Sequence, residues 1–332
     1  MKRIFFILSA FIAFFMSSCS NDDIPVTMTG ETVFKINPET VMKPFKEYNV
    51  GDLDMVLSGC KLRVRLLVYN PEGSLVNKVE EKVTSYVSKV QANMLLEQGK
   101  YRAVVITDVV SDENQEYWTL SDEATLTSAK IKDAGFLGGQ NEVLGIGSLE
   151  FSVGESLNEI QINPNPAGAL LCLTWYNMQS YTSIKEVTLE NNRVADYLVM
   201  NGSGNYDVAV KNNANQYSWR TWFISPFEEN IDNGYNYNFV LPMSNISYRY
   251  RIDFTDDTHQ YSDEYNLNIK AGEEYLFYCN LKDENNNDYW VTNVALVNGD
   301  TKSRVINEIE GLHPFKKYLS KSVKLSSLIK LN

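Results

Sequence analysis

The sequence of 332 residues is poor in the residue types that build metal centres and covalent frameworks. It contains two His and four Cys, too few for a His-rich metal centre, a zinc ribbon or a disulfide-dense scaffold. It also lacks a basic excess, since 30 Lys and Arg stand against 42 Asp and Glu, for a formal net charge of −12. That balance argues against a nucleic-acid partner. Nine Pro beside 20 Tyr and 15 Phe indicate a strand-rich chain.

Catalytic motifs are missing as well. The sequence has no nucleophile elbow, no P-loop, no Gly-x-Gly-x-x-Gly after a strand and no His-Glu-x-x-His. We therefore expect no enzyme activity, no cofactor and no metal site. The acidic segments 256–264 and 283–288 are rich in oxygen ligands, but EF-hand spacing is absent. Hairpin loops are the favoured interpretation of both segments.

The first hydrophobic run is too short to span a bilayer. Lys2 and Arg3 precede an apolar stretch from Ile4 to Met16, whereas a spanning helix needs about 20 apolar residues. A basic start, an apolar run and small residues before Cys19 are typical of a secretory signal peptide. We therefore predict a signal peptide over residues 1–18.

The segment Ser17-Ser18-Cys19 resembles a bacterial lipobox, in which the Cys is acylated and becomes the new N-terminus. Several acyl chains, palmitate among them, would attach the protein stably to a membrane. The acidic Ser20-Asn21-Asp22-Asp23 stretch resembles the surface-export signal of Bacteroidota lipoproteins. We expect lipidation at Cys19, a tether over 19–31, and a lipid-anchored, surface-exposed protein of the outer membrane.

The remaining chain shows strands and almost no helix. Residues 61–69 alternate, so that Leu62, Val64, Leu66 and Val68 face one way and Lys61, Arg63 and Arg65 the other. Short strand patterns separated by Asn, Gly, Asp and Ser turns predict a sandwich or barrel. We expect an N-terminal β-sandwich over 32–155 and a C-terminal β-sandwich over 156–298, the second beginning with a strand near Leu157–Asn163. The Pro-containing stretch 163–168 cannot be a central strand.

The three cysteines after Cys19 are Cys60, Cys172 and Cys279, an odd number. At least one must therefore be unpaired in an oxidising compartment. Cys172 and Cys279 lie in strand-like runs, which favours buried free thiols.

Three segments carry a resemblance to a known family. They are Val-Tyr-Asn-Pro-Glu-Gly-Ser-Leu-Val at 68–76, Gln-Gly-Lys-Tyr-Arg-Ala-Val-Val at 98–105 and Ala-Gly-Glu-Glu-Tyr-Leu-Phe at 271–277. With the lipidated N-terminus, they resemble the fimbrial anchor subunits of Bacteroidales, which are fimbrillin-like lipoproteins. The resemblance covers roughly residues 30–298 and implies two tandem transthyretin-like or immunoglobulin-like β-sandwiches. It also implies fimbrial or pilin subunits as partners.

The C-terminal tail, residues 299–332, is basic, with seven Lys or Arg against two Glu from residue 301 onward. Alternate apolar positions fit a strand that could pair with another subunit; they are Val323, Leu325, Ile329 and Leu331. A helix and a frayed tail are rival interpretations. Attraction to an acidic neighbour or to anionic lipid is a further one.

The segment Tyr217-Ser-Trp219-Arg-Thr-Trp222 offers a different function. Exposed aromatic rings beside polar groups bind sugars, and Tyr217, Trp219 and Trp222 could form such a platform. Core packing is the competing interpretation, although two Trp three apart on a regular strand would face opposite sides. We thus expect a cell-adhesion lipoprotein that anchors or assembles a fimbria-like polymer by strand pairing. A surface glycan-binding lipoprotein is the alternative.

Overall fold

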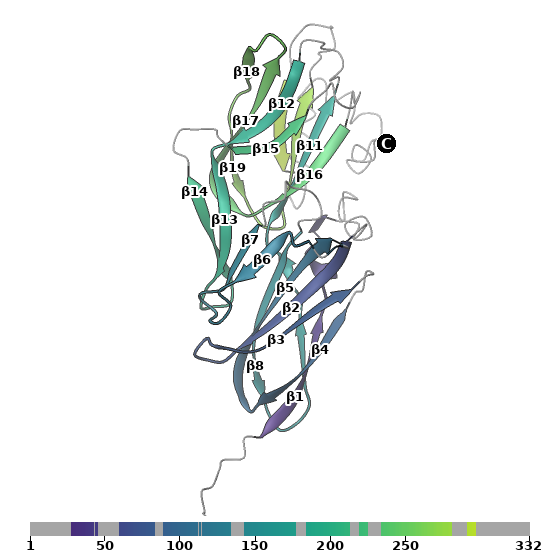
Figure 1. Ribbon diagram of the computed structural model, residues 1–332, viewed down its shortest axis with the longest axis vertical. Helices are drawn as coiled ribbons and strands as arrows, with labels where there is room; N and C mark the ends of the chain where they lie inside the picture. Colours follow the sequence, from purple (N-terminus) through teal and green to yellow (C-terminus); the bar gives the residue numbers. More distant parts are fainter. Residues whose placement is uncertain are drawn as a thin grey trace, which may run out of the picture.

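A computed structural model of the chain describes residues 28–42, 44–45, 60–83, 89–111, 113, 115–133, 143–176, 184–212, 219–224, 234–280 and 291–296. Within them almost every element is a β-strand, and the single α-helix is the short α1 (Glu39–Met42). The strands form two β-sandwiches stacked along one long axis (Figure 1). The all-β sandwich class expected from the sequence is confirmed. Among the described residues, no helix is long and apolar enough to cross a bilayer.

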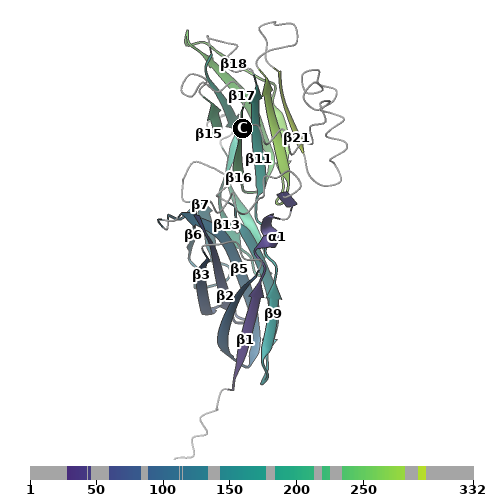
Figure 2. The ribbon, with the colours of Figure 1, turned by 90° about the vertical axis from the view of Figure 1, so that its right-hand side faces the viewer.

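The N-terminal sandwich is built from two sheets. The outer sheet has the order β4-β1-β9 and the central sheet the order β10-β8-β5-β2-β3. The outer sheet contains β1 (Thr29–Ile36), β4 (Val90–Glu97) and β9 (Asn158–Ile162). The central sheet contains β2 (Cys60–Tyr69), β3 (Leu75–Val83), β5 (Gly99–Ser111), β8 (Gly145–Val153) and β10 (Asn165–Pro166). Figure 2 shows β1 and β9 on one side of β2 and β5.

Strand β9 corrects the sequence-based grouping of strands. We expected a strand near Leu157–Asn163 to open the second sandwich. Instead β9 pairs in parallel with β1, with Phe34 opposite Ile160, and so belongs to the N-terminal sandwich. A parallel partner 126 residues away leaves no local turn pattern in the sequence. As expected, the Pro-containing stretch is not a central strand, because β10 lies at the edge of the central sheet.

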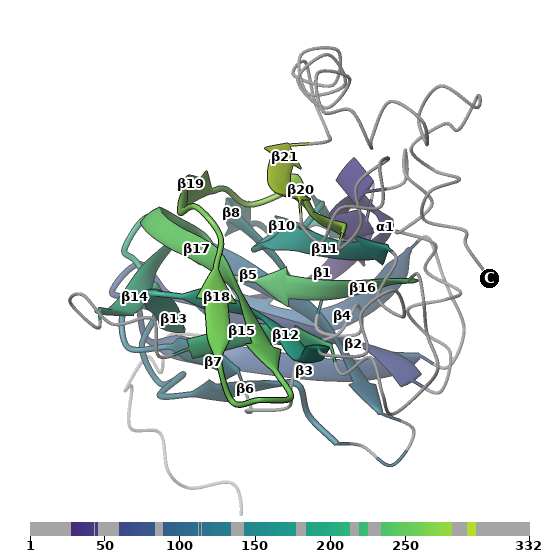
Figure 3. The ribbon, with the colours of Figure 1, turned by 90° about the horizontal axis from the view of Figure 1, so that it is seen from above.

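The C-terminal sandwich also consists of two sheets. One has the order β16-β11-β20-β21; its strands are β11 (Ala169–Tyr176), β16 (Gly234–Val240), β20 (Glu274–Asn280) and β21 (Val291–Leu296). The other has the order β15-β12-β17-β18, with β19 also paired to β17. Its strands are β12 (Ile184–Asn191), β15 (Trp219–Ile224), β17 (Met243–Phe254), β18 (His259–Tyr261) and β19 (Tyr265–Ile269). Seen along the long axis, this sandwich overlies the first (Figure 3).

A fifth sheet, here called the bridging sheet, joins the two halves of the chain. Its order is β14-β13-β7-β6, and it contains β6 (Trp118–Ser121), β7 (Lys130–Asp133), β13 (Arg193–Met200) and β14 (Tyr206–Asn212). Strand β7 comes from the first half and β13 from the second, and they pair antiparallel with Ile131 opposite Leu198. Both side chains are fully buried. Main-chain hydrogen bonds therefore run directly from one half to the other.

The two cores follow this arrangement. One apolar cluster fills the N-terminal sandwich and continues into the second half through residues such as Leu198 and Phe239. A second cluster lies between the sheets of the C-terminal sandwich and includes Leu189, Tyr248 and Phe277. The rings of Tyr248 and Phe277 meet edge to face with centroids 5.1 Å apart. Only the second cluster is confined to one half of the chain.

Candidate functional site

The outer face of the central sheet is covered where the bridging sheet lies on it and open beyond. On β2 and β5, positions 63, 65, 106 and 108 share the face opposite to Leu62 and Val64. Arg63 donates a hydrogen bond to the main-chain oxygen of Trp118 in β6, at 2.8 Å. The alternation predicted for residues 61–69 is therefore correct. Its second face, however, is buried by a third layer that the pattern did not indicate.

A cluster of charged side chains is enclosed between these layers. Arg63, which is 1% exposed, donates to both carboxylate oxygens of Asp108, at 2.9 Å and 2.6 Å, and also contacts Glu116. Arg65 donates to the same Asp108 carboxylate at 3.3 Å. Burial lowers the pKa of Arg63, but bonds and charges from Asp108 and Glu116 outweigh it and raise the pKa above its ordinary value. Two cations thus share the buried Asp108 carboxylate, and the exposed Glu116 adds a second anion at the edge of the cluster.

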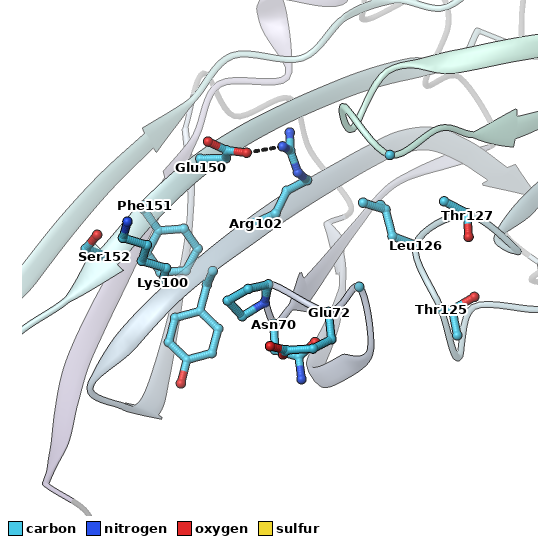
Figure 4. A pocket seen from close by; sticks show the side chains of 14 residues that line it. Asn70, Glu72, Lys100, Arg102, Thr125, Leu126, Thr127, Glu150, Phe151 and Ser152 are labelled. Carbon is cyan, nitrogen blue, oxygen red and sulfur yellow. Dashed lines mark hydrogen bonds and ion pairs between the residues drawn. The ribbon is translucent and has the colours of Figure 1, made fainter.

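A cleft of about 510 Å³ opens on the uncovered part of the same face. Figure 4 shows its parts: Lys100 and Arg102 from β5, Glu150 and Ser152 from β8, the turn with Asn70 and Glu72, and the loop with Thr125 and Thr127. The guanidinium of Arg102 contacts the Glu150 carboxylate and the main-chain oxygen of Ser203. We call it the charged cleft, because side chains of both signs line it.

The floor of the charged cleft depends on one tight turn. Gly73 has φ = 81°, which favours glycine, and its N–H donates to the main-chain oxygen of Asn70 at 2.9 Å. Its own oxygen accepts from the N–H of Leu126 at 2.8 Å. The turn Asn70-Pro-Glu-Gly73 was recognisable in the sequence. The loop that it holds, 122–128, carried no functional signal.

A second cleft, of about 780 Å³, lies where the two halves meet. It is bounded by β8 and β10 of the first half, the turn between β13 and β14, and the turn that precedes β20. Among the described residues that line it, none is Asp, Glu, Lys, Arg or His, although the guanidinium of Arg102 lies beside Gly204. We call it the neutral cleft. In the sequence, the Asn-Pro-Asn-Pro stretch on one of its walls indicated only that residues 163–168 are not a central strand.

Most of the sequence-predicted site residues lie outside the described residues: Cys19, Tyr217, Val323, Leu325, Ile329 and Leu331. For Trp219 and Trp222 the structure describes the strand pairing. They stand opposite Asn191 and Leu189 of β12, and a bulge absorbs the extra residue between them. The two positions therefore pair with residues of one face of β12, where we expected opposite faces. The platform itself stays a prediction.

The expected free thiol is confirmed at Cys279, which is not in a disulfide. It is fully buried, and burial raises the pKa of its thiol to about 12. Cys60 is also buried. Within the described ranges, no three His, Cys, Asp or Glu side chains are grouped to hold a metal ion. The carboxylate of Asp256, one of the acidic residues noted in the sequence, accepts a hydrogen bond from the main-chain N–H of Thr258 at 3.0 Å.

Glu274, at the start of β20 and opposite Leu170, is fully buried. Burial raises the pKa of its carboxyl from 4.5 to about 8. Because the folded-state pKa lies above the unfolded one, its contribution to stability is complete below about pH 4.5 and is lost as the pH rises through 8. The melting temperature should therefore fall between pH 5 and pH 8.5. Glu274→Gln should flatten this fall in thermal melts; an equal fall in both proteins would contradict the assignment.

Comparison with known proteins gives likeness of fold only. No protein-family model matches the sequence, and a search of curated proteins finds no significant match. The fold is similar to a Bacteroides thetaiotaomicron structure provisionally described as polysaccharide-binding, at 13% identity, TM-score 0.46, and coverage of 82% of this chain and 99% of that chain. It is also similar to a Bacteroides ovatus structure provisionally described as an adhesin, at 13% identity, TM-score 0.47, and coverage of 82% and 93%. The tip fimbrial protein Mfa3 of Porphyromonas gingivalis matches at 7% identity, TM-score 0.41, and coverage of 82% and 100%.

Proposed function

We propose that this protein is a non-catalytic surface lipoprotein that holds a fimbria-like polymer on the outer membrane. Acylated Cys19 would be the membrane anchor, and pilin-type subunits would bind by main-chain pairing along a sheet edge. We take the class of role, adhesion and fimbrial assembly, from the fold neighbours. Support for it comes from the chain itself.

The observation that carries the proposal is the position in the molecule of the first described residues. Strand β1 begins at the end of the long axis farthest from the C-terminal sandwich (Figures 1 and 2). Eight residues separate Cys19 from Met28, so the distance between the two Cα atoms is at most about 32 Å. An acylated Cys19 would therefore keep the N-terminal sandwich near the membrane. The C-terminal sandwich would project away from it.

Each sheet of the projecting sandwich has edge strands, which pair with only one neighbouring strand among the described residues. In its two sheets these include β16, β21 and β15. An edge strand offers main-chain N–H and C=O groups to an incoming strand. Such pairing needs no catalytic side chain, and the partner's own strand would supply the other half of the hydrogen bonds.

Recovery of partners from detergent-solubilised outer membranes tests the proposal. Wild-type protein should fractionate with membranes and recover polymerising β-sandwich subunits. Cys19→Ala should lose the membrane fraction, whereas the matched neighbour variant Ser20→Ala should keep it. A chain truncated after Asp300 should stay in the membrane and lose the subunits if the tail is the paired strand.

Two outcomes would count against the proposal. If wild-type protein recovers no β-sandwich subunit, the proposed role of holding a fimbria-like polymer is wrong. Retention on a polysaccharide column in that case, lost in Trp219→Ala or Trp222→Ala, would favour the glycan-binding alternative.

A further inference from the structure

Strand β1 is held along both of its edges. It is the middle strand of the outer sheet, where eight residue pairs join it antiparallel to β4 and five join it in parallel to β9. Main-chain hydrogen bonds extend this pairing at both ends. Gln98 N–H donates to the oxygen of Met28 at 2.9 Å, and Asn37 N–H donates to the oxygen of Ile162 at 3.2 Å. The first described strand is therefore tied into its sheet along its whole length.

The side chains of β1 oppose its sliding along its neighbours. Phe34 and Ile36 are fully buried, and the Phe34 ring meets that of Phe151 in the central sheet edge to face, with centroids 5.4 Å apart. On the other face, Lys35 pairs with Glu159 of β9 at 2.6 Å. A slip of one residue would turn the buried side chains to the opposite face of the sheet. Movement of β1 along its axis therefore disrupts the core and both ladders together.

The direction of β1 decides how a pulling force acts on it. The strand begins at the end of the long axis farthest from the C-terminal sandwich and runs toward that sandwich in both Figure 1 and Figure 2. A force between the segment before Met28 and the C-terminal sandwich therefore acts nearly along β1. Such a force strains all the ladder bonds at once, whereas a force across the strand opens them one after another. Each bond contributes little by itself, so simultaneous strain gives the greater resistance.

Tension on the C-terminal sandwich reaches the N-terminal sandwich through several main-chain contacts. The pairing of β7 with β13 joins the two halves. At the junction before β11, Ala167 N–H donates to the oxygen of Leu144 at 2.8 Å. Arg102 of β5 also donates to the main-chain oxygen of Ser203 in the turn between β13 and β14. The halves are thus connected by hydrogen bonds as well as by the covalent chain.

We propose that β1 is the force-bearing strand of this protein: tension between the segment before it and the C-terminal sandwich is resisted by shear of the β1–β4 and β1–β9 ladders as a unit. This inference rests on the proposed function, which places a membrane at one end of the molecule and a polymer at the other. A polymer on a cell surface is pulled by flow and by whatever it adheres to. An anchor whose first strand unzipped would fail under that pull.

Single-molecule force spectroscopy of the full chain tests the proposal by changing only the direction of the pull. One handle is attached at Ser20, before β1, and the other at one of two exposed residues at opposite ends of β4, Gln91 or Glu97. Glu97 stands opposite Thr29 at the beginning of β1, and Gln91 stands opposite Lys35 near its end. A pull at Gln91 therefore shears the β1–β4 ladder, and a pull at Glu97 unzips it. The rupture force should be about twofold or more higher at Gln91.

The pull that corresponds to the proposed function has its second handle at Thr258, in the exposed turn between β17 and β18. Its rupture force should be close to that at Gln91. Phe34→Leu weakens the packing of β1 and should lower the rupture force of the Gln91 pull. Leu189→Val, a matched substitution buried in the C-terminal sandwich, should leave that force unchanged. The comparison of handles uses wild-type cores, so it remains decisive if Phe34→Leu folds poorly.

Equal rupture forces at Gln91 and Glu97 would overturn the proposal, as would a Thr258 pull that ruptures at the Glu97 force. An equal effect of Phe34→Leu and Leu189→Val on the Gln91 pull would do the same. The measurement needs neither the lipid nor a partner protein. Failure of the membrane and recovery tests would therefore refute the proposed function without changing the rupture forces, so the two proposals can fail separately.

Discussion

Asp108→Ala should lower the free energy of unfolding by about 3–5 kcal/mol, the cost of breaking a buried ion pair from one side. The substitution leaves Arg63 and Arg65 enclosed between the central and bridging sheets without the carboxylate that both contact. Arg63 would retain Glu116, whose side chain is 45% exposed, so its charge is only partly compensated. Urea denaturation followed by tryptophan fluorescence measures the loss.

Two further variants make the Asp108 result specific. Lys35→Met breaks the exposed pair with Glu159, 2.6 Å apart, and should cost no more than about 1 kcal/mol. Replacing the cluster as a whole, with Arg63→Met, Arg65→Leu and Asp108→Leu together, should restore most of the stability. If Asp108→Ala costs as little as Lys35→Met, the buried cluster does not contribute as described.

Trp118→Ala should cost about 3–5 kcal/mol and should divide one unfolding transition into two. Trp118 is 2% exposed and meets Phe239 of the second half edge to face, with ring centroids 6.4 Å apart. Its main-chain oxygen still accepts the hydrogen bond of Arg63 in the variant. The variant therefore removes the packing of the Trp118 ring against the second half and keeps the hydrogen bond to Arg63. Differential scanning calorimetry should then resolve two peaks, one for each half.

The control for Trp118 is Tyr261→Ala, since Tyr261 is 40% exposed at β18 and lies within the C-terminal sandwich. It should leave a single transition at a nearly unchanged temperature. A single transition in Trp118→Ala would mean that the β7–β13 pairing alone couples the two halves.

Local patterns predicted the strands well because alternation is a property of a few neighbouring residues. The strand over 61–69 and the turn at 70–73 are where the pattern places them. Alternation cannot say whether the second face meets water or another layer. Arg63 and Arg65 therefore look like solvent-facing residues in the sequence, although both are buried.

Pairings between distant segments were not predictable in the same way. Nothing local distinguishes β9 as a partner of β1, or β7 as a partner of β13. The neutral cleft is a product of such pairings, since Ser148, Asn163 and Asn205 come together only after both halves have folded. A single sequence contains the hydroxyls and amides but not their convergence.

The pairing of β7 with β13 also has a consequence for how the chain folds as it is made. Strands β6 and β7 are made well before residues 193–239, which supply Leu198 and Phe239 to cover Ile131 and Trp118. A chain that emerges N-terminus first thus carries an uncovered apolar layer until its second half arrives. Such long-range closure is slow and exposes surface that aggregates. A nascent chain of this kind needs a holdase chaperone for longer than two independent sandwiches would.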